Sequence, residues 1–273
     1  MTLLAVQGLS KSFGGVHANQ DVSLAVSAGT VHSVIGPNGA GKTSLINMLS
    51  GVYRPDAGSI RLDGAELAGL ATHRFAAAGI GRTFQNLQVF FNMTALENVM
   101  TGRYLREQGL LLASLLRLPS LQRAEASCRD AARRLLRTVG LAAYEDAPAE
   151  AMPYGALKRL EIARALAAEP KLLLLDEPAA GLNATEARDI DVLIKQLAAA
   201  GTTVVLVEHN MKLVMAVSDR VTVLDRGRVL ADGTPDEVSH DPRVIEAYLG
   251  AAESAVESAV HSAVDSAAGA AHA

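Results

Sequence analysis

The sequence has 273 residues, 49% of them hydrophobic, and a formal net charge of −4, which allow one large α/β domain or two small ones with a substantial core. It contains no long basic run, so we expect no nucleic acid among its partners. The single cysteine, Cys128, excludes an internal disulfide and a cysteine metal cluster, and it fits a reducing cytoplasm.

The first predicted elements are two short strands, at residues 3–6 and 22–26, with a turn at residues 12–15 between them and Asp21 at the start of the second strand. The N-terminus has no basic segment followed by an apolar run, so no secretory signal is predicted. Phe13 lies in the turn, where its ring is placed to stack on a nucleotide base, an interaction that contributes about 1–3 kcal/mol. A core aromatic at a strand end explains the spacing nearly as well.

A glycine-rich loop is the strongest motif of the sequence. A β-branched run at residues 30–35 predicts a buried strand before it, and residues 44–50, apolar at helical spacing and closed by Gly51, predict a helix after it. Between them, every fixed position of G-x-x-x-x-G-K-[ST] is filled. The loop residues are Gly36, Pro37, Asn38, Gly39, Ala40, Gly41, Lys42 and Thr43, followed by Ser44.

This strand–loop–helix arrangement suits phosphate binding. Glycines let successive backbone N–H groups converge on phosphate oxygens, and the helix N-terminus adds a positive dipole end. Lys42 would reach the β- and γ-phosphates, and the Thr43 hydroxyl would ligate Mg²⁺. The sequence therefore predicts a nucleotide site here.

After two further extended runs, at residues 57–64 and 80–85, the pattern becomes helical from about residue 86 to about residue 164. Thr94 and Glu97 have the spacing of a capping box before a helix. Residues 121–139 have apolar positions on one side and arginines on the other. We interpret this region as an inserted helical subdomain. The apolar run at residues 110–118 is too short to span a bilayer, so we favour a buried helix over a partner surface.

The second half returns to the sheet at residues 171–178, where four consecutive leucines predict a strand buried on both faces. Asp176 and Glu177 follow them, at the edge where open α/β sheets bind ligands. This is the Walker B pattern: Asp176 would hold Mg²⁺ through water, and Glu177 would polarise the attacking water. Asn183 with Glu186 predicts another capping box, before a helix that runs to about residue 199.

Four more features complete the sequence. A strand at residues 202–207 ends in Glu208 and His209; a lone histidine is usually structural, but this position favours contact with the γ-phosphate. Residues 221–230 predict a hairpin. Residues 152–166 predict a glycine turn that leads into an amphipathic helix. From residue 253 a four-residue period of alanine, serine and valine predicts a frayed or disordered tail.

From about residue 3 to 249 the chain resembles the ATP-binding subunits of ABC transporters. The segments that carry the resemblance are GPNGAGKTS, Gln85, the YGALKRLEIARAL region, LLLLDEP, AGLN and His209. Within that family the chain is most similar to the ATPases of branched-chain amino acid importers, through RTFQN, LEIAR, DEPAAGLN, EHNMKLVM and AYLG.

The resemblance implies a P-loop NTPase core, α/β with a mixed sheet flanked by helices, and an inserted helical subdomain. The core would comprise residues 3–85 and 165–250 and the helical subdomain residues 86–164, with residues 251–273 a low-complexity tail. The chain would bind ATP and Mg²⁺ and hydrolyse ATP, with Glu177, His209 and Gln85 catalytic. Gln85 would also ligate Mg²⁺ and sense the permease, and Phe13 would stack on adenine.

The same resemblance implies partners. Tyr154 and Gly155 would close over the γ-phosphate of ATP bound to a second ATPase subunit, so that two subunits enclose two nucleotides. Hydrolysis would drive two transmembrane permease subunits fed by a solute-binding protein, from the cytoplasmic side of the inner membrane. The solute would be a branched-chain amino acid or a related small polar molecule.

The chain departs from the usual signature, L-S-G-G-Q. Pro153 stands in place of the serine and Tyr154 in place of the first glycine, while Ala156 and Leu157 stand where glutamines are common. Because proline has neither a hydroxyl nor an N–H group, we expect an asymmetric pair with a second, related ATPase. A homodimer that tolerates Pro153 is the alternative.

The competing functions are a soluble ABC ATPase acting on ribosomes or DNA, and a P-loop kinase.

Overall fold

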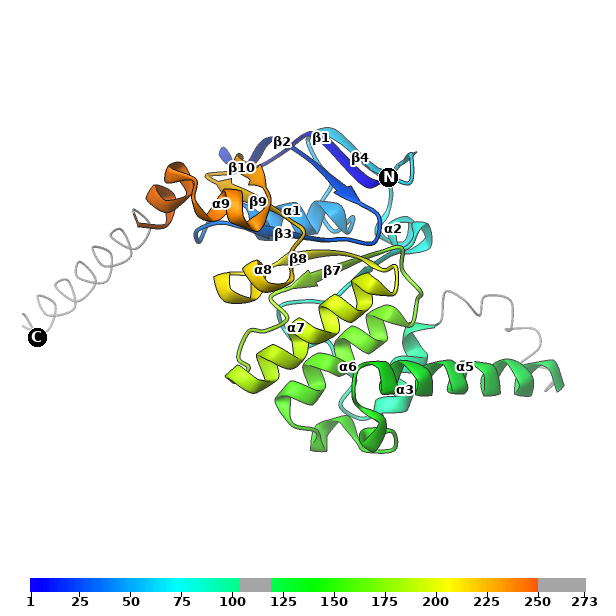
Figure 1. Cartoon of the computed structure of the whole chain (residues 1–273). Helices are drawn as coiled ribbons and strands as arrows, with labels where there is room; N and C mark the ends of the chain where they lie inside the picture. The colour runs from blue at the N-terminus through cyan, green and yellow to red at the C-terminus, as the bar shows by residue number, and fades with distance from the viewer. Residues whose placement is uncertain (104–118, 250–273) are drawn as a thin grey trace, which may run out of the picture.

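The computed structural model describes residues 1–103 and 119–249 and confirms an α/β fold around a mixed sheet (Figure 1). This sheet has six strands in the order β10-β9-β3-β8-β7-β6. Five of them run parallel, and β10 pairs antiparallel with β9. The strands are β3 (Val31–Ile35), β6 (Ile80–Arg82), β7 (Leu172–Asp176), β8 (Thr203–Val207), β9 (Arg220–Asp225) and β10 (Arg228–Gly233).

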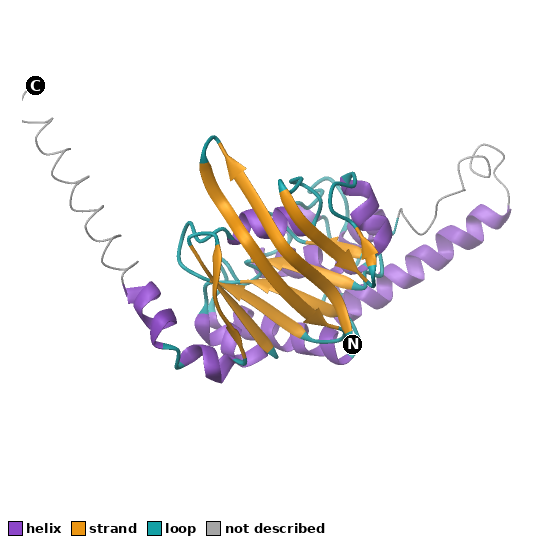
Figure 2. Cartoon of the chain, turned by 90° about the horizontal axis from the view of Figure 1, so that it is seen from above, coloured by secondary structure: helices purple, strands orange, loops and turns teal. Residues whose placement is uncertain are grey.

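The N-terminal strands form a second sheet, antiparallel, in the order β2-β1-β4-β5 (Figure 2). Its strands are β1 (Thr2–Phe13), β2 (Val16–Ser27), β4 (Ala57–Leu62) and β5 (Ala65–Glu66). β1 and β2 are longer than predicted, because their polar residues lie on the partly exposed face of the sheet. Asp21 does not begin β2 but lies inside it, with a φ of 54°. Such irregularities interrupt the alternation on which the sequence prediction relied.

Helix α1 (Lys42–Leu49), which begins inside the glycine-rich loop, packs between the two sheets. Its buried Leu45, Ile46 and Leu49 share one hydrophobic cluster with Leu4 of β1 and Leu174 of β7. Burying a leucine or isoleucine side chain contributes about 1.5–3 kcal/mol, so this contact anchors the loop to both sheets.

The other face of the mixed sheet is covered by a helical layer (Figure 1). There Leu173, Leu175 and Leu206 join a cluster with α3, α5, α6 and α7. These helices are α3 (Ala95–Gly102), α5 (Pro119–Thr138), α6 (Tyr154–Leu166) and α7 (Ala184–Ala199). The shorter helices are α2 (Thr72–Ala78), η2 (Ala142–Tyr144), η3 (Ala149–Ala151), α8 (Met211–Val217) and α9 (Pro235–Ser239). The division into core and helical subdomain stays a prediction.

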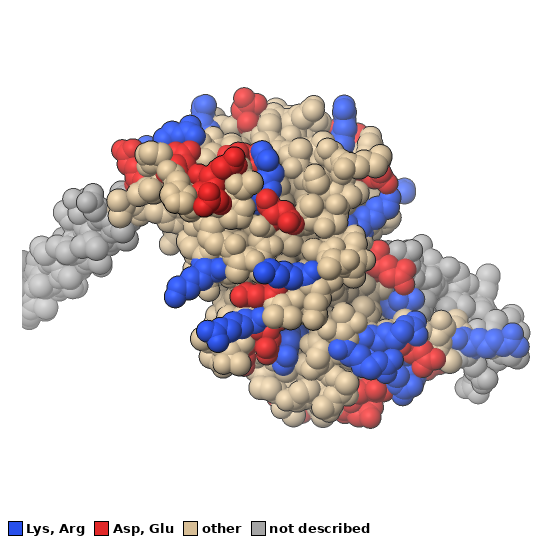
Figure 3. All heavy atoms as spheres, in the orientation of Figure 1, with Lys and Arg blue, Asp and Glu red and all other residues tan. Residues whose placement is uncertain are grey.

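Both predicted capping boxes are confirmed, at Thr94 for α3 and at Asn183 for α7. Helix α5 is amphipathic as predicted, and its buried side chains include Ala131, Ala132, Leu136 and Val139. Figure 3 shows the outward-facing Lys and Arg side chains that gather where α5 lies. The predicted hairpin is also present, as β9 and β10.

The predicted glycine turn before α6 is wrong. Pro153 is the N-cap, and Gly155 is already inside the helix. α6 is also buried on most sides rather than amphipathic, because it packs at the centre of the helical layer. The predictions for residues 110–118 and for the tail lie outside the described residues. Within the described ranges, no helix is both long and apolar enough to cross a membrane.

Candidate nucleotide site

The loop between β3 and α1 adopts backbone conformations that glycine takes easily and other residues take rarely. Gly39 and Gly41 have φ values of 78° and 98°, in the left-handed region. A Cβ on Gly36 would lie 2.1 Å from the carbonyl oxygen of Leu224, and one on Gly41 would lie 2.3 Å from that of Ala18. Neighbouring backbone therefore excludes larger residues at both positions. No side chain caps α1, so its first N–H groups have no side-chain acceptor and remain available to an anion.

Lys42 is folded into this loop. Its ammonium Nζ donates to the carbonyl oxygens of Gly36 at 2.7 Å and Pro37 at 3.0 Å, and the residue is 9% exposed. Burial lowers the pKa of Lys42, while the carboxylates of Glu177 and Asp176 raise it. The electrostatic interaction indicates that the two predicted Walker B carboxylates lie close to the phosphate loop.

Asp176 ends β7 as a buried carboxylate. Its Oδ2 lies 3.0 Å from Nη2 of Arg82, and both side chains are largely buried. Burial raises the pKa of Asp176, and the Arg82 guanidinium opposes this by hydrogen bonding and charge. The ion pair therefore favours the carboxylate form of Asp176.

Glu177, Gln85 and His209 converge beside Asp176. The amide Nε2 of Gln85 donates to Oε2 of Glu177 at 3.1 Å, and Nδ1 of His209 lies 3.8 Å from Oε1 of Glu177. Glu177 itself has a φ of 49°, and its backbone N–H donates to Val207 of β8. This left-handed conformation is uncommon for a non-glycine residue, and among the described residues Glu177 shares it with Asp21, Asp63, Glu169 and Arg226.

The predicted metal ligands suit Mg²⁺ chemically. Thr43, Gln85 and Asp176 offer a hydroxyl, an amide and a carboxylate oxygen, the hard donors that Mg²⁺ prefers. Asp176 is 5% exposed, and its position near Lys42 places this carboxylate at the loop. Mg²⁺ usually takes only one or two protein carboxylates together with substrate phosphates, so a site with a single carboxylate ligand fits the ion.

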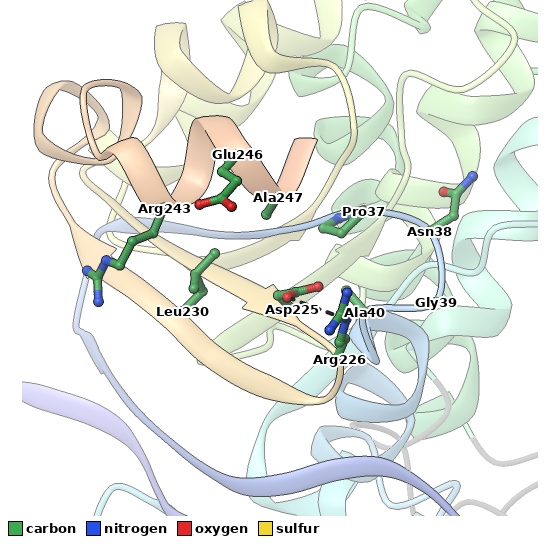
Figure 4. A pocket seen from close by; sticks show the side chains of 10 residues that line it. All are labelled: Pro37, Asn38, Gly39, Ala40, Asp225, Arg226, Leu230, Arg243, Glu246 and Ala247. Carbon is green, nitrogen blue, oxygen red and sulfur yellow. Dashed lines mark ion pairs between the residues drawn. The ribbon is translucent and has the colours of Figure 1, made fainter. Parts of the chain in front are cut away.

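A pocket of about 590 Å³ opens beside the exposed side of the phosphate loop (Figure 4). The loop residues Pro37 to Ala40 form one wall, and Asp225 and Arg226 of the β9–β10 hairpin form another. Arg243 and Glu246, near the C-terminal end of the described chain, close the third side. The loop is thus accessible from solvent on this side.

Phe13 ends β1 with a ring that is 43% exposed. It packs edge-on against Tyr53, with 5.2 Å between the ring centroids, and Lys11 lies over it at 5.3 Å. The ring is accessible to a base, so its role as the adenine-stacking residue stays a prediction. Tyr53 was not predicted as a neighbour, because it follows α1 in the sequence with no pattern of its own.

Tyr154 and Gly155 lie at the N-terminus of α6 and contact the segment that follows Glu177. The Tyr154 ring, 44% exposed, lies over Gly181. A Cβ on Gly155 would lie 2.4 Å from the carboxylate of Glu186, which caps α7. Neither of these contacts involves residues 36–44. Their predicted role, closing over a nucleotide held by another subunit, is therefore compatible with their position.

Comparison with known proteins identifies the family. Residues 19–180 match the family described as "ABC transporter", and residues 228–254 match "Branched-chain amino acid ATP-binding cassette transporter". The chain belongs to the ABC transporter family. Its members of this type hydrolyse ATP to power transport and work as peripheral partners of membrane permeases. The chain is thus an ATP-binding protein with ATPase activity.

Two relatives align over 251 residues, 92% of this chain and 98% of their own length. They are the high-affinity branched-chain amino acid transport ATP-binding proteins BraF of Pseudomonas aeruginosa, 45% identical, and LivG of Escherichia coli K12, 43% identical. A solved nucleotide-free ATP-binding cassette, 32% identical, has a TM-score of 0.79 and covers 91% of this chain and 99% of its own. A cassette in its ADP conformation, also 32% identical, has a TM-score of 0.80, and the match covers 92% of this chain and 99% of that cassette.

The cassette contains buried charges that were not predicted from the sequence. Lys158 and Glu161 of α6 are each 2% exposed. Nζ of Lys158 donates to the carbonyl oxygen of Gln85 at 3.1 Å, and Oε1 of Glu161 accepts from the backbone N–H of Phe84 at 3.0 Å. The sequence of α6 has four charged residues, and it did not indicate which of them would be buried. Lys158 and Glu161 attach α6, which begins at the signature region, to the segment around Gln85.

Glu208 was also missed. It is 1% exposed, and its carboxylate accepts from the backbone N–H groups of Ala179, His209 and Asn210 at 3.0, 3.0 and 3.3 Å. The loop after β7, which carries Glu177, is thereby joined to the loop after β8, which carries His209. A buried carboxylate with three such donors fixes the relative positions of two predicted catalytic residues.

Proposed function

We propose that the chain is the ATP-binding and ATP-hydrolysing subunit of an importer for branched-chain amino acids or a related small polar solute. The observation that carries the proposal is the convergence of Glu177, Gln85 and His209 beside a phosphate loop with a buried lysine. The solute assignment rests on relatives such as BraF, whose names state branched-chain amino acid transport.

In this mechanism the phosphate loop binds ATP, the substrate. Backbone N–H groups of the loop and the start of α1 receive the phosphate oxygens, and Lys42 neutralises charge on the β- and γ-phosphates. Thr43, Gln85 and Asp176 would hold Mg²⁺, which neutralises phosphate charge when bound. Phe13 stacks on the adenine ring.

Glu177 acts on the attacking water. One of its carboxylate oxygens accepts the water proton, while the Gln85 amide at 3.1 Å holds the other oxygen in place. His209 contacts the γ-phosphate. Its Nδ1 lies 3.8 Å from Oε1 of Glu177, the carboxylate oxygen that Gln85 does not hold. Glu208 keeps the two loops at this separation.

The proposed site on the permease side is a groove of about 480 Å³ next to Gln85. Its lining includes Phe84 and Phe90, which are 40% and 46% exposed. Apolar side chains exposed in a groove are typical of an interface, and the proposed occupant is a cytoplasmic helix of a permease, since helices bind in apolar grooves of this kind. The proposal assigns the chain to the cytoplasmic face of the inner membrane, with two permease subunits and, indirectly, a solute-binding protein as its partners.

Cysteines in this groove are expected to cross-link to the permease in an assembled, active complex. Gln88 and Phe90 are the suitable positions, because both line the groove and are exposed. Val89 is only 9% exposed and packs into the helical cluster, so a cysteine there reports on the core. The measurement is a bifunctional cross-linker followed by gel electrophoresis, in a background with Cys128 replaced by serine. A cysteine at Ser239 in α9 is the matched control and should not cross-link.

Failure of both groove cysteines to reach the permease would mean that residues 86–91 serve only the packing of the helical layer.

The proposed function itself has a separate test. The complex purified through this chain is placed in proteoliposomes with its binding protein, and ATP-dependent uptake of labelled leucine is measured. Uptake of leucine supports the proposal, whereas a complex without a permease, or one that transports only unrelated solutes, contradicts it.

We also propose that the chain works in an asymmetric pair with a second, related ATPase. Pro153, the N-cap of α6, provides no side-chain cap and cannot supply the hydroxyl that a serine would donate. The free N–H groups at the start of α6 and the helix dipole remain, so the composite site at the partner's nucleotide is weakened rather than lost.

If the pair is asymmetric, Pro153→Ser is expected to raise ATP turnover only modestly in the assembled transporter. Only the partner's nucleotide site would gain the hydroxyl, because the nucleotide on this chain's own loop already meets the partner's signature. A missing hydrogen bond to a charged group costs about 1.5–3 kcal/mol, so a homodimer would gain at both sites. A bulky residue at Gly155 is a poorer test, because it would displace Glu186 from the cap of α7. Mass spectrometry of the active complex checks the composition. A complex with this chain as its single kind of ATPase polypeptide would disprove the asymmetric pair.

A further inference from the structure

Arg82 connects three parts of the cassette through one guanidinium group. Nη1 donates to Oδ1 of Asn47 at 2.7 Å and to Oγ of Ser50 at 2.8 Å, both at the C-terminal end of α1. Nη2 donates to Oδ2 of Asp176 at 3.0 Å, at the end of β7. The planar fork of arginine thus holds the helix of the phosphate loop and the Walker B carboxylate in one fixed relation.

The opposite side of Arg82 faces the groove. Arg82 itself lines the groove, and its guanidinium lies 4.7 Å from the ring centroid of Phe84, which lines it as well. The backbone N–H of Phe84 is in turn held by the buried Glu161 of α6. Arg82 is therefore in contact both with the groove surface and with the nucleotide site.

The guanidinium is also incompletely satisfied. The Arg82 side chain is 8% exposed, yet its Nε has no hydrogen-bond partner within the described ranges 1–103 and 119–249. A buried donor without a partner reduces the stability of this one arrangement relative to others. A shift of Phe84 when the groove is filled would therefore act on a guanidinium that three hydrogen bonds hold through Nη1 and Nη2 while its Nε has no partner among the described residues.

From these contacts we infer that Arg82 is a positioning residue, which transmits occupancy of the groove to Asp176 and α1 and so adjusts ATP hydrolysis. The inference rests on the proposed function, because it takes the groove to be the permease site. Gln85 is not required for this connection, since none of the four contacts of Arg82 described above involves it.

The test compares Arg82→Met and Arg82→Lys with the wild-type chain, alone and assembled with the permease. Methionine keeps much of the length but loses all donors, whereas lysine keeps the charge but loses the fork. We expect stimulation of ATP turnover by the permease to fall about tenfold in both variants, a typical size for coupling between sites. The amount of permease that co-purifies is measured in parallel, so that turnover is compared per assembled complex and a loss of stimulation is separated from a loss of binding. ATP affinity of the isolated chain, measured without Mg²⁺, should stay unchanged in Arg82→Lys.

Asn47→Ala removes only the contact to α1, so it is expected to lose part of the stimulation. Arg133→Met is the matched control: it removes an arginine–carboxylate pair, with Glu145, in the helical layer and should leave stimulation intact. If Arg82→Met does not fold, as judged by thermal unfolding, Arg82→Lys and Asn47→Ala still decide the question.

Full stimulation in Arg82→Lys and Asn47→Ala would overturn the inference, because the fork would then not matter. That outcome leaves the proposed function intact. A wild-type chain that neither binds the permease nor is stimulated by it would instead contradict the proposed function, and the two failures are thereby distinguished.

Discussion

Replacing Glu177 by glutamine is expected to lower the rate of ATP hydrolysis by about 10²–10⁴-fold, the effect typical of losing a general base. Glutamine keeps the size of the side chain and can still accept the hydrogen bond from Gln85, which is 3.1 Å long. The substitution adds no backbone strain, because glutamate and glutamine branch alike at Cβ and tolerate the φ of 49° equally well. The phosphate loop is not touched, so ATP binding should persist. Steady-state turnover and the ATP dissociation constant are measured on the same preparation.

The chain contains a close control for this substitution. Glu169 is also a glutamate with a positive φ, 52°, and its carboxylate pairs with Arg103 in a mainly exposed position. Glu169→Gln should therefore show the effect of the same chemical change without a change in turnover. Near-normal hydrolysis in Glu177→Gln would reject Glu177 as the base. Equal losses in both variants would indicate a general loss of folding instead.

The fold could be predicted largely because its strongest signals are local. The glycines of the phosphate loop, the capping boxes at Thr94 and Asn183, and the leucines of β7 each act through residues a few positions apart, and the structure contains all of these elements. The extent of β1 and β2 could not be predicted in this way. Their irregular register depends on the pairing of whole strands, which no short pattern records.

The geometry of the candidate site depends on contacts between distant residues. Arg82 and Asp176 are 94 positions apart, and Gln85 and Glu177 are 92 apart. The sequence identified Asp176, Glu177 and Gln85 as candidates from their motifs and the family resemblance. It gave no sign that Arg82 would pair with one of them or that Glu208 would join two loops. A charged residue is usually exposed, and only the packed structure shows which charges are buried and therefore need partners.

Replacing Lys42 by alanine is expected to weaken ATP binding itself. Removing a hydrogen bond to a charged group costs about 1.5–3 kcal/mol, which corresponds to roughly a 10- to 150-fold rise in the dissociation constant. The structure adds a second reason, because Nζ of Lys42 also holds the carbonyl oxygens of Gly36 and Pro37. Without the ammonium these two carbonyls lose their donor, and the loop is no longer held in the shape that receives phosphate. Titration of a fluorescent ATP analogue measures the effect.

The substitutions at Lys42 and Glu177 are expected to change different quantities, binding in one case and turnover in the other. Lys42→Ala should raise the dissociation constant, whereas Glu177→Gln should lower turnover at an unchanged dissociation constant. Lys171→Ala is the control for loss of a lysine, since Lys171 forms an ion pair with Asp63 and is 54% exposed. Surface pairs of this kind contribute at most about 1 kcal/mol, so ATP affinity should not change. Unchanged ATP affinity in a folded Lys42→Ala protein would mean that residues 36–43 are not the nucleotide site, and the roles assigned to Asp176 and Glu177 would fail with it.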